Sequence, residues 1–333
     1  CLDWKMIRDK YNYYPKQYSA FKKYFPKNAE NSLSGSIVRE IHQDASGSLW
    51  IGTEDAGLNK LDTTTGTFVH FQPTGAKGSI SYSNIHGLLV TGNELWIGTF
   101  EHGLDVMNIK TGKVIRHYSQ GPGPHELKSN FIYCIYQDNS GEIILGTTRG
   151  AFTYNRTSDD FSYVPGLPVT WYSSLLKDDN GVIWAGTYGN GVNYYNTKTG
   201  KGGNFRYIVD QKNSIASDRI NSIFKDSRKT LWFATEGGLC RYNPATNDFK
   251  RYTTKNGLPS NFILSLLEDD RKNFWISTSK GLVRFNPVTE ELNTYTKDNG
   301  LLNDQFNFSS AFKDKTGRMY FGSVKGLISF HPD

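Results

Sequence analysis

Cysteine and methionine are scarce in this 333-residue sequence, with three of each, and long apolar runs are missing. An odd number of cysteines without recurring spacing (Cys1, Cys134 and Cys240) excludes a disulfide framework and a cysteine zinc site. No apolar run approaches the roughly 18 residues of a membrane span, and no signal peptide is visible. We expect a soluble segment without direct membrane contact, in which Cys134 and Cys240 are small core residues. Cys1 is either a lipid-modified N-terminal residue or the point where a longer chain was cut.

Strong charge of either sign is also missing. The net charge is +6, from 38 basic and 32 acidic residues, and residues 1–30 carry four of these six charges. A nucleic-acid-binding protein concentrates positive charge on its working face, so we predict no nucleic-acid binding. No two of the seven histidines have the spacing of a zinc-binding helix. We predict neither a metal site nor a cofactor.

Glycine and aromatic residues are abundant, with 33 Gly, 20 Tyr, 20 Phe and 7 Trp. This composition suits many short strands joined by tight turns. One strand-turn-strand pattern occurs seven times, and its clearest copy is residues 37–53. Such a repeat decides the fold before any single motif does. The Trp50 position recurs at an average spacing of 45 residues, at Trp96, Ile144, Trp184, Trp232, Trp275 and Tyr320.

Each copy consists of four predicted strands with fixed turn residues. The first strand ends on an aspartate in six copies, at Asp44, Asp138, Asp178, Asp226, Asp269 and Asp314. An aspartate there binds its own backbone and starts a turn, so we interpret these residues as structural. The sialidase Asp-box is also a structural turn. Its glycine follows the aspartate by two residues, whereas Gly47 follows Asp44 by three. The second strand usually closes on Gly-Thr, and its small glycine allows a neighbouring backbone to approach closely.

Four-stranded repeats of this length are what a β-propeller requires. The last copy ends at Asp333 without a fourth strand, whereas the N-terminal region has an unmatched one, Phe21-Lys22-Lys23-Tyr24. The prediction is an all-β, seven-bladed β-propeller of four-stranded antiparallel blades over residues 18–333. Its ring is closed by the N-terminal strand, which completes the last blade and protects its edge. Residues 1–17 are predicted to be a linker or the remnant of a preceding domain.

These motifs resemble the two-component regulator propeller repeats, which form the periplasmic sensor regions of hybrid two-component histidine kinases in gut Bacteroidetes. The resemblance covers residues 18–333, and its most specific string is Asp-x-x-Gly-x-Leu-Trp-Ile-Gly-Thr at residues 44–53. The string Asn-Gly-Leu, at residues 256–258 and 299–301, is a second element of the likeness. The final copy, from Gln305 to Gly322, looks like the family's last blade.

The resemblance implies a periplasmic, non-catalytic sensor domain that binds an oligosaccharide or relays its binding to a downstream histidine kinase. It also implies a place as the second, membrane-proximal propeller, with a preceding propeller and a following immunoglobulin-like domain in the same parent chain. A homodimer is a further expectation. The alternative is a structural propeller that mediates contacts between propellers or protomers without a ligand of its own.

Propellers bind ligands where the second-to-third strand loops and the connections between blades gather at one end of the channel. Positions there that differ between copies are free to be specific. At one matched position of the first strands the copies carry Arg39, His86, Tyr133, Ser173, Asn221, Leu264 and Ser309. Sugars are recognised by aromatic faces beside planar polar groups, and the second to fifth copies supply both. The predicted ligand-binding residues are Arg39, His86, Phe100, Glu101, Tyr133, Arg149, Trp171, Tyr188, Arg219, Asn221 and Glu236.

Two readings compete with this site. The aromatic residues can instead plug the channel mouth or pack between blades. The loop acids can instead form a glycosidase or lyase site, which for a glycosidase requires two carboxylates on either side of one bond. The candidate acids are scattered among the copies, at Glu54, Asp55, Glu101, Asp218, Glu236 and Asp304. A fold alone implies no active site, so we predict no enzyme activity and no catalytic residues.

Overall fold

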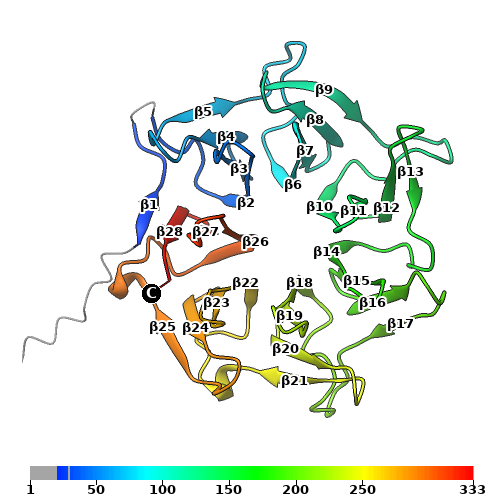
Figure 1. Cartoon of the computed structure of the whole chain (residues 1–333), viewed down its shortest axis with the longest axis vertical. Coiled ribbons are helices and arrows are strands. Elements are labelled where there is room, and N and C mark those ends of the chain that lie inside the picture. Colours follow the sequence, from blue (N-terminus) through cyan, green and yellow to red (C-terminus); the bar gives the residue numbers. More distant parts are fainter. Residues whose placement is uncertain (1–20, 29–30, 333) are drawn as a thin grey trace, which may run out of the picture.

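The computed structural model describes residues 21–28 and 31–332, and it forms a ring of seven β-sheets around a central channel (Figure 1). Each sheet has four antiparallel strands. In six sheets the strands follow one another in sequence order, and in the seventh the first strand of the chain takes the fourth place. In six blades the chain runs outward, from an inner strand beside the channel to an outer strand at the rim of the ring. The predicted seven-bladed, all-β propeller is therefore confirmed.

The first four blades are β2–β5, β6–β9, β10–β13 and β14–β17. Their strands are β2 (Val38–Gln43), β3 (Leu49–Thr53), β4 (Leu58–Leu61), β5 (Phe68–Phe71), β6 (Ile85–Thr91), β7 (Glu94–Thr99), β8 (Leu104–Asn108), β9 (Lys113–Tyr118), β10 (Ile132–Gln137), β11 (Ile143–Thr147), β12 (Gly150–Asn155), β13 (Asp160–Tyr163), β14 (Tyr172–Lys177), β15 (Val182–Thr187), β16 (Val192–Asn196) and β17 (Gly202–Phe205).

The remaining blades are β18–β21, β22–β25 and the seventh, β26–β28 with β1. Their strands are β18 (Ile220–Lys225), β19 (Leu231–Thr235), β20 (Gly238–Asn243), β21 (Asp248–Tyr252), β22 (Ile263–Glu268), β23 (Phe274–Thr278), β24 (Gly281–Phe285), β25 (Leu292–Tyr295), β26 (Phe306–Lys313), β27 (Met319–Ser323), β28 (Gly326–Phe330) and β1 (Lys22–Tyr24). Two 3-10 turns, η1 (Thr254–Asn256) and η2 (Lys297–Asn299), precede the sixth and seventh blades.

The ring closes in the seventh blade, where β1 pairs antiparallel with β28. Lys22 faces Ser329 and Tyr24 faces Leu327 in this pairing. The Phe21 ring packs edge-on against Phe330, with 5.0 Å between the ring centroids. The predicted exchange of the N-terminal strand is therefore confirmed. The predicted linker, residues 1–17, lies outside the described residues.

The aspartate and tryptophan of each repeat form one local unit. In blade 1, Asp44 Oδ1 accepts hydrogen bonds from the backbone N–H groups of Ser46 and Ser48, while Trp50 Nε1 donates to Oδ2 at 2.9 Å. The same indole–aspartate bond joins Trp184 to Asp178, Trp232 to Asp226 and Trp275 to Asp269. The aspartate thus orders the turn and satisfies the N–H of a buried indole.

Blades 2 and 3 each lack one member of this aspartate–tryptophan unit. Blade 2 has no aspartate at the turn, and Trp96 Nε1 donates instead to Glu94 Oε2 at 3.0 Å. Blade 3 has Ile144 in place of the tryptophan, and its Asp138 forms an ion pair with Lys177, with 3.0 Å between Nζ and Oδ2. A carboxylate therefore stays near the indole where an indole is present, and takes another partner where it is not.

The blades pack against one another through apolar faces. One core cluster joins blades 1 and 2 and consists of Trp50, Leu58, Ile80, Ile85, Leu88, Leu95, Ile97 and Met107. The glycine of the second strand permits this approach, because a Cβ on Gly52 would lie 2.7 Å from Ile85 Cγ2 in the next blade. Burial of both faces of each inner strand is the main stabilising contribution to the ring.

The Asn-Gly-Leu strings form the two 3-10 turns. In η1, Thr253 N–H donates to Asn256 Oδ1 at 2.9 Å, and Gly257 ends the turn in a left-handed conformation with φ 96°. The leucine that follows, Leu258, is buried between blades. Apart from these turns the described residues form no helix, and none could cross a membrane as a helix.

Candidate functional site

The two ends of the ring are built from different connections. We call the end with the second-to-third strand loops and the links between blades the upper end. The first-to-second and third-to-fourth strand turns form the lower end. These definitions follow from the strictly sequential order of strands within each blade. All eleven predicted ligand-binding residues belong to the upper end or to the inner strands just below it.

A β-bulge occurs near the upper end of every inner strand. In blade 1, Val38 pairs with Thr53 and Glu40 with Gly52, which leaves Arg39 outside the ladder. The corresponding shifts occur at His86, Tyr133, Ser173, Asn221 and Leu264. A bulge leaves its extra residue unpaired and re-aims the side chain. A position that varies between copies is therefore the one that the fold releases from strand pairing.

The seventh blade corrects the sequence alignment. Phe306 pairs with Ser323, and the ladder resumes only at Ala311, opposite Phe321, so its bulge holds three extra residues, two more than the bulges of the other blades. Asn307 Nδ2 donates to Val38 O at 3.0 Å, just as Asn221 Nδ2 donates to Ile263 O at 2.7 Å. Asn307 is thus the structural equivalent of Arg39. Assigning Ser309 to that position was wrong, because the insertion lies inside the bulge.

Six rings form a continuous row along the upper end of blades 2 to 4, which we call the aromatic arc. Its members are Phe100, His86, Phe131, Tyr133, Trp171 and Tyr188, and neighbouring ring centroids lie 4.2 to 5.8 Å apart. Phe131 contacts four of the other five rings. It was not among the predicted site residues. Its position, two residues before the bulge residue of blade 3, was the signal that could have identified it.

Arg39 fills the channel mouth beside the buried part of the arc. Its guanidinium carbon lies 4.7 Å from the centroid of Tyr133 and 5.4 Å from that of Phe308, on blades 3 and 7. Nη1 lies 3.3 Å from Glu54 Oε1. Burial alone would lower the pKa of Arg39, but Tyr133 and Glu54 raise it, so the group stays charged. Arg39 and Tyr133, at 2% and 7% exposure, therefore act as the plug that the competing reading described.

His86 belongs to the same buried part. Burial, and then the charge of Arg39, lower the pKa of His86 to about 2. The imidazole is therefore neutral at physiological pH. Its Nδ1 atom is buried and has no hydrogen-bond partner among the described residues. Below this plug, a cavity of about 280 Å³ continues down the channel between serine hydroxyls, including those of Ser174, Ser222 and Ser265.

The other end of the arc is open to solvent. The Trp171 and Tyr188 rings are stacked with 4.2 Å between centroids, and Tyr188 is 38% exposed. The Arg219 guanidinium lies 4.9 Å from the centroid of Tyr188, and its Nη1 lies 3.3 Å from Glu236 Oε2. These four predicted residues, from blades 4 and 5, therefore form one partly exposed surface, in which a stacked aromatic pair lies beside an ion pair.

The remaining predicted residues do not join this surface. The Asn221 amide is used to hold the next blade, through its bond to Ile263 O. Glu101 and Arg149 are exposed on the second-to-third strand loops of blades 2 and 3, and no contact links their side chains to the arc in the described part of the chain. Glu101 has a left-handed backbone with φ 65°.

The candidate acids of the upper end are mostly engaged one by one. Glu54 pairs with Arg39, Glu236 with Arg219, and Asp218 with Arg206 at 2.7 Å. Asp55 accepts hydrogen bonds from the backbone N–H groups of Ser36 and Ile37. Within residues 21–28 and 31–332, no three His, Cys, Asp or Glu side chains are grouped as a metal site requires.

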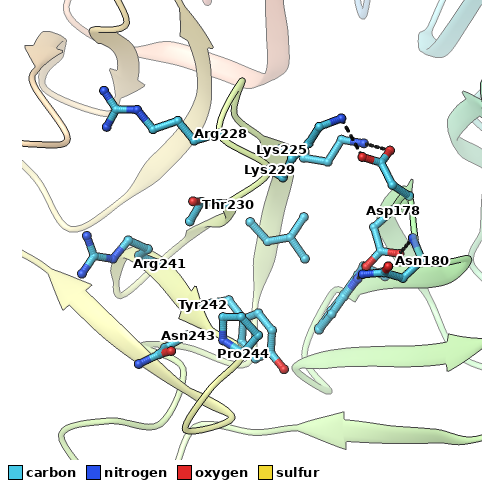
Figure 2. A pocket seen from close by; sticks show the side chains of 13 residues that line it. Asp178, Asn180, Lys225, Arg228, Lys229, Thr230, Arg241, Tyr242, Asn243 and Pro244 are labelled. Atoms are coloured by element: carbon cyan, nitrogen blue, oxygen red, sulfur yellow. Dashed lines mark hydrogen bonds and ion pairs between the residues drawn. The ribbon is translucent and has the colours of Figure 1, made fainter.

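A second candidate site lies at the lower end, between blades 4 and 5, and was not anticipated from the sequence. It is a pocket of about 500 Å³, and Figure 2 shows the side chains that line it. Four of them are cationic, namely Lys225, Arg228, Lys229 and Arg241. The available signal was the turn of blade 5, where Arg228-Lys229 replaces the small and glycine residues of most other copies.

Five segments of the chain match the family described as "Two component regulator propeller", namely residues 32–55, 126–149, 166–189, 214–237 and 257–280. They fall on blades 1, 3, 4, 5 and 6, and each runs from the link before the inner strand to the upper end of the second strand. The two unmatched blades each depart from the pattern, by the lost aspartate in blade 2 and the enlarged bulge in blade 7, whereas blade 3 is matched although it has Ile144 in place of the tryptophan. The predicted resemblance is confirmed.

A curated relative, "Histidine kinase P4" of Formosa agariphila, is 28% identical over 93% of this chain. The chain spans only 23% of that protein's length. Among solved structures, the extracellular domain of a B. thetaiotaomicron protein described as a hybrid two component system aligns with TM-score 0.77 and 21% identity, over 93% of this chain and 42% of that one. Virginiamycin B lyase from Staphylococcus aureus aligns with TM-score 0.69 and 13% identity, over 93% and 98% of the two chains. At such identities these structures show the fold alone.

Proposed function

Because five of its seven blades carry the two-component regulator propeller repeat, we propose that the chain is the non-catalytic propeller part of a two-component sensor and binds an oligosaccharide. In this proposal the domain lies in the periplasm and its parent chain is a hybrid histidine kinase. A preceding propeller and a following immunoglobulin-like domain belong to the same parent chain. The shared fold with extracellular domains of B. thetaiotaomicron proteins and the likeness to a named histidine kinase support this arrangement.

The observation that carries the ligand assignment is the open end of the aromatic arc. Trp171 and Tyr188 form a stacked pair whose Tyr188 ring is 38% exposed, and Arg219 with Glu236 supplies charged hydrogen-bonding groups beside it. Aromatic faces pack against the apolar C–H surfaces of a sugar ring, while planar polar groups bind its hydroxyls. The arc continues inward to a plugged channel, so the ligand lies across the rim of blades 4 and 5 rather than down the axis.

Titration calorimetry of a panel of oligosaccharides tests this proposal directly. Trp171→Ala and Arg219→Ala should each weaken the binding of the best ligand about tenfold or more, because each removes a direct contact. Tyr163→Ala is the matched control, since Tyr163 is an exposed aromatic residue (42%) on an outer strand, away from the arc. Binding that survives both arc substitutions, or no binding by any glycan, contradicts the proposal.

A second function, contact with a neighbouring propeller or protomer, is favoured by exposed apolar residues at the same end of the ring. Val169 is 66% exposed in the link between blades 3 and 4, and Ile208 and Val209 are 45% and 68% exposed in the link between blades 4 and 5. The consecutive exposed residues Ile208 and Val209 are candidates for such an interaction surface. If Val209→Asp abolishes self-association in sedimentation while glycan binding is unchanged, this end serves assembly as well.

The third possible function is catalysis, by a lyase or glycosidase site. Turnover of an oligosaccharide by the purified protein, lost on Glu101→Ala or Glu236→Ala, would establish a lyase or glycosidase. Glu236 is engaged by Arg219, with 3.3 Å between Oε2 and Nη1.

A further inference from the structure

The enlarged bulge of blade 7 reaches across the mouth of the channel. Ser309 Oγ donates a hydrogen bond to Asn221 O, on the inner strand of blade 5, at 3.1 Å. The centroid of the adjacent Phe308 ring lies 5.4 Å from the Arg39 guanidinium carbon of blade 1 and 5.8 Å from the centroid of Phe262, just before β22. Blade 6 separates blades 5 and 7 in the ring (Figure 1), so the bulge joins blades that are not neighbours.

The start of β18 holds several blades together. The carbonyl groups of residues 219–221 accept hydrogen bonds, in that order, from Glu236 N, Ser173 Oγ and Ser309 Oγ at 3.3, 2.5 and 3.1 Å. The Asn221 amide in addition binds a carbonyl of blade 6. This one segment therefore ties blade 5 to blades 4, 6 and 7, and it cannot shift without loosening at least one of these bonds.

Arg219 connects this segment to the open end of the aromatic arc. Its guanidinium carbon lies 4.9 Å from the centroid of Tyr188, and the two residues also form an isolated antiparallel bridge. The Arg219 side chain is 51% exposed, so a ligand can reach it. Only Ile220 separates Arg219 from Asn221, so a displacement of the Arg219 backbone also moves the Asn221 carbonyl.

The backbone of Ser309 is strained. Its φ is 51°, in the left-handed region, where a side chain is disfavoured. None of the six bulge residues of the other blades has a positive φ. Strain of this kind persists only where surrounding contacts enforce it, and it is common in segments that switch. The hydrogen bond to Asn221 is one such contact, so its loss favours relaxation of the bulge.

We infer that residues 307–310 form a latch that couples the open end of the arc to blade 7. In the latched arrangement Ser309 binds Asn221 O. In the released arrangement that bond is broken and Ser309 adopts an ordinary φ. A ligand that binds Arg219 in place of Tyr188 displaces the start of β18 and shifts the balance toward release.

Blade 7 is the blade on which such a change has the widest effect. It contains β1 and β28, the first and last strands described, so release alters the blade in which both ends of the described chain meet. The inference rests on the proposed function only for the ligand contact at Arg219. The coupling itself is a property of the protein alone.

Hydrogen exchange followed by mass spectrometry on the 333-residue chain tests the coupling without any ligand. Ser309→Ala removes the hydroxyl and keeps the strained backbone, so the amides of residues 306–313 should exchange about two- to tenfold faster, as expected for the loss of one hydrogen bond. Arg219→Ala should also accelerate exchange there, although Arg219 lies on another blade. Once the latch is open Arg219→Ala has no further effect on it, so the double variant should exchange no faster than Ser309→Ala.

Two control variants separate the latch from a general loosening of the fold. Arg149→Ala removes an exposed arginine at the same end of the ring, on blade 3, and should leave the exchange of residues 306–313 unchanged. Ser309→Gly removes the hydroxyl but also relieves the strain, so its melting temperature should exceed that of Ser309→Ala. The amides of β10 are the reference and should exchange at the wild-type rate in every variant.

The coupling and the proposed function can fail separately. Exchange of residues 306–313 that is unchanged in Arg219→Ala, faster in the double variant than in Ser309→Ala, or matched by faster exchange of β10 would overturn the coupling. A melting temperature of Ser309→Gly below that of Ser309→Ala would overturn the strained latch. A chain that binds no glycan but shows the expected exchange pattern refutes the proposed function and sustains the coupling, and glycan binding without that pattern does the reverse.

Discussion

The strand that closes the ring gives the most direct prediction of stability. Phe21 is 8% exposed and packs edge-on against Phe330 and Tyr295, with centroid distances of 5.0 and 6.1 Å. Replacing a buried phenylalanine by alanine removes its transfer free energy and leaves a cavity, which together cost about 3–5 kcal/mol. Because Phe21 is near the ring's outer edge, we expect Phe21→Ala to lower the free energy of unfolding by about 3 kcal/mol.

The assay is urea unfolding combined with hydrogen exchange. In Phe21→Ala the three-residue strand β1 should detach before the rest of the ring unfolds, so the amides of β28 that face it should exchange faster. Phe249→Ala is the matched control, because Phe249 occupies the outer strand of blade 5, is 3% exposed and lies in a continuous blade. It should lower global stability without selective exchange in any one strand.

An equal response of the two variants would refute this reasoning. If the β28 amides stay protected in Phe21→Ala, then β1 does not hold the ring closed. Deletion of residues 1–24 should have the same effect in stronger form and expose an unpaired strand edge, which promotes association between chains.

Three further predictions concern single groups. Trp232→Phe should cost about 1–3 kcal/mol in urea unfolding, because it leaves the buried Asp226 carboxylate without its indole donor. His117 Nδ1 donates a hydrogen bond to Asp105 Oδ1 at 2.6 Å, and that bond raises the pKa of His117 above its ordinary value. This contribution to stability is complete below pH 6.5 and is lost as the pH rises through the higher folded-state pKa. We therefore expect His117→Gln to lower the melting temperature at pH 5.5 and to have little effect at pH 9. An equal loss of melting temperature at both pH values would contradict this prediction. Burial raises the pKa of Cys240 to about 12, so this thiol should remain unmodified by iodoacetamide at pH 8 in the native protein, as checked by peptide mass spectrometry.

Much of the fold follows from the sequence because the repeat is periodic and its turn residues act locally. Asp44, Gly47 and Trp50 each act within about six residues of one another, so their roles are visible in any one copy. The closing strand could also be predicted, since its pattern matches that of residues 249–252 and the last copy lacks one. The bulge of blade 7 could not, because its two residues beyond those of the other bulges resemble a shift of the whole alignment.

The candidate site was predictable only in part, and the reason is again physical. Comparison between copies identified Trp171, Tyr188, Arg219 and Glu236, which the fold brings together. It did not distinguish them from Arg39 and Tyr133, which are variable as well but are buried in the channel mouth. Burial at the axis depends on side chains that cross from non-neighbouring blades, such as Arg39 reaching Tyr133, and no single repeat contains that information.

The bulge at the top of each inner strand has a consequence for how such a domain can diversify. Its residue takes no part in the ladder, so a mutation there changes the lining of the mouth while the hydrogen bonds of the blade remain intact. Each of the seven positions belongs to a separate sheet, although some of their side chains touch one another, as Arg39 touches Tyr133. New ligand preferences can therefore arise one blade at a time, by point substitution or by exchange of a whole repeat, on a scaffold that continues to fold throughout the process.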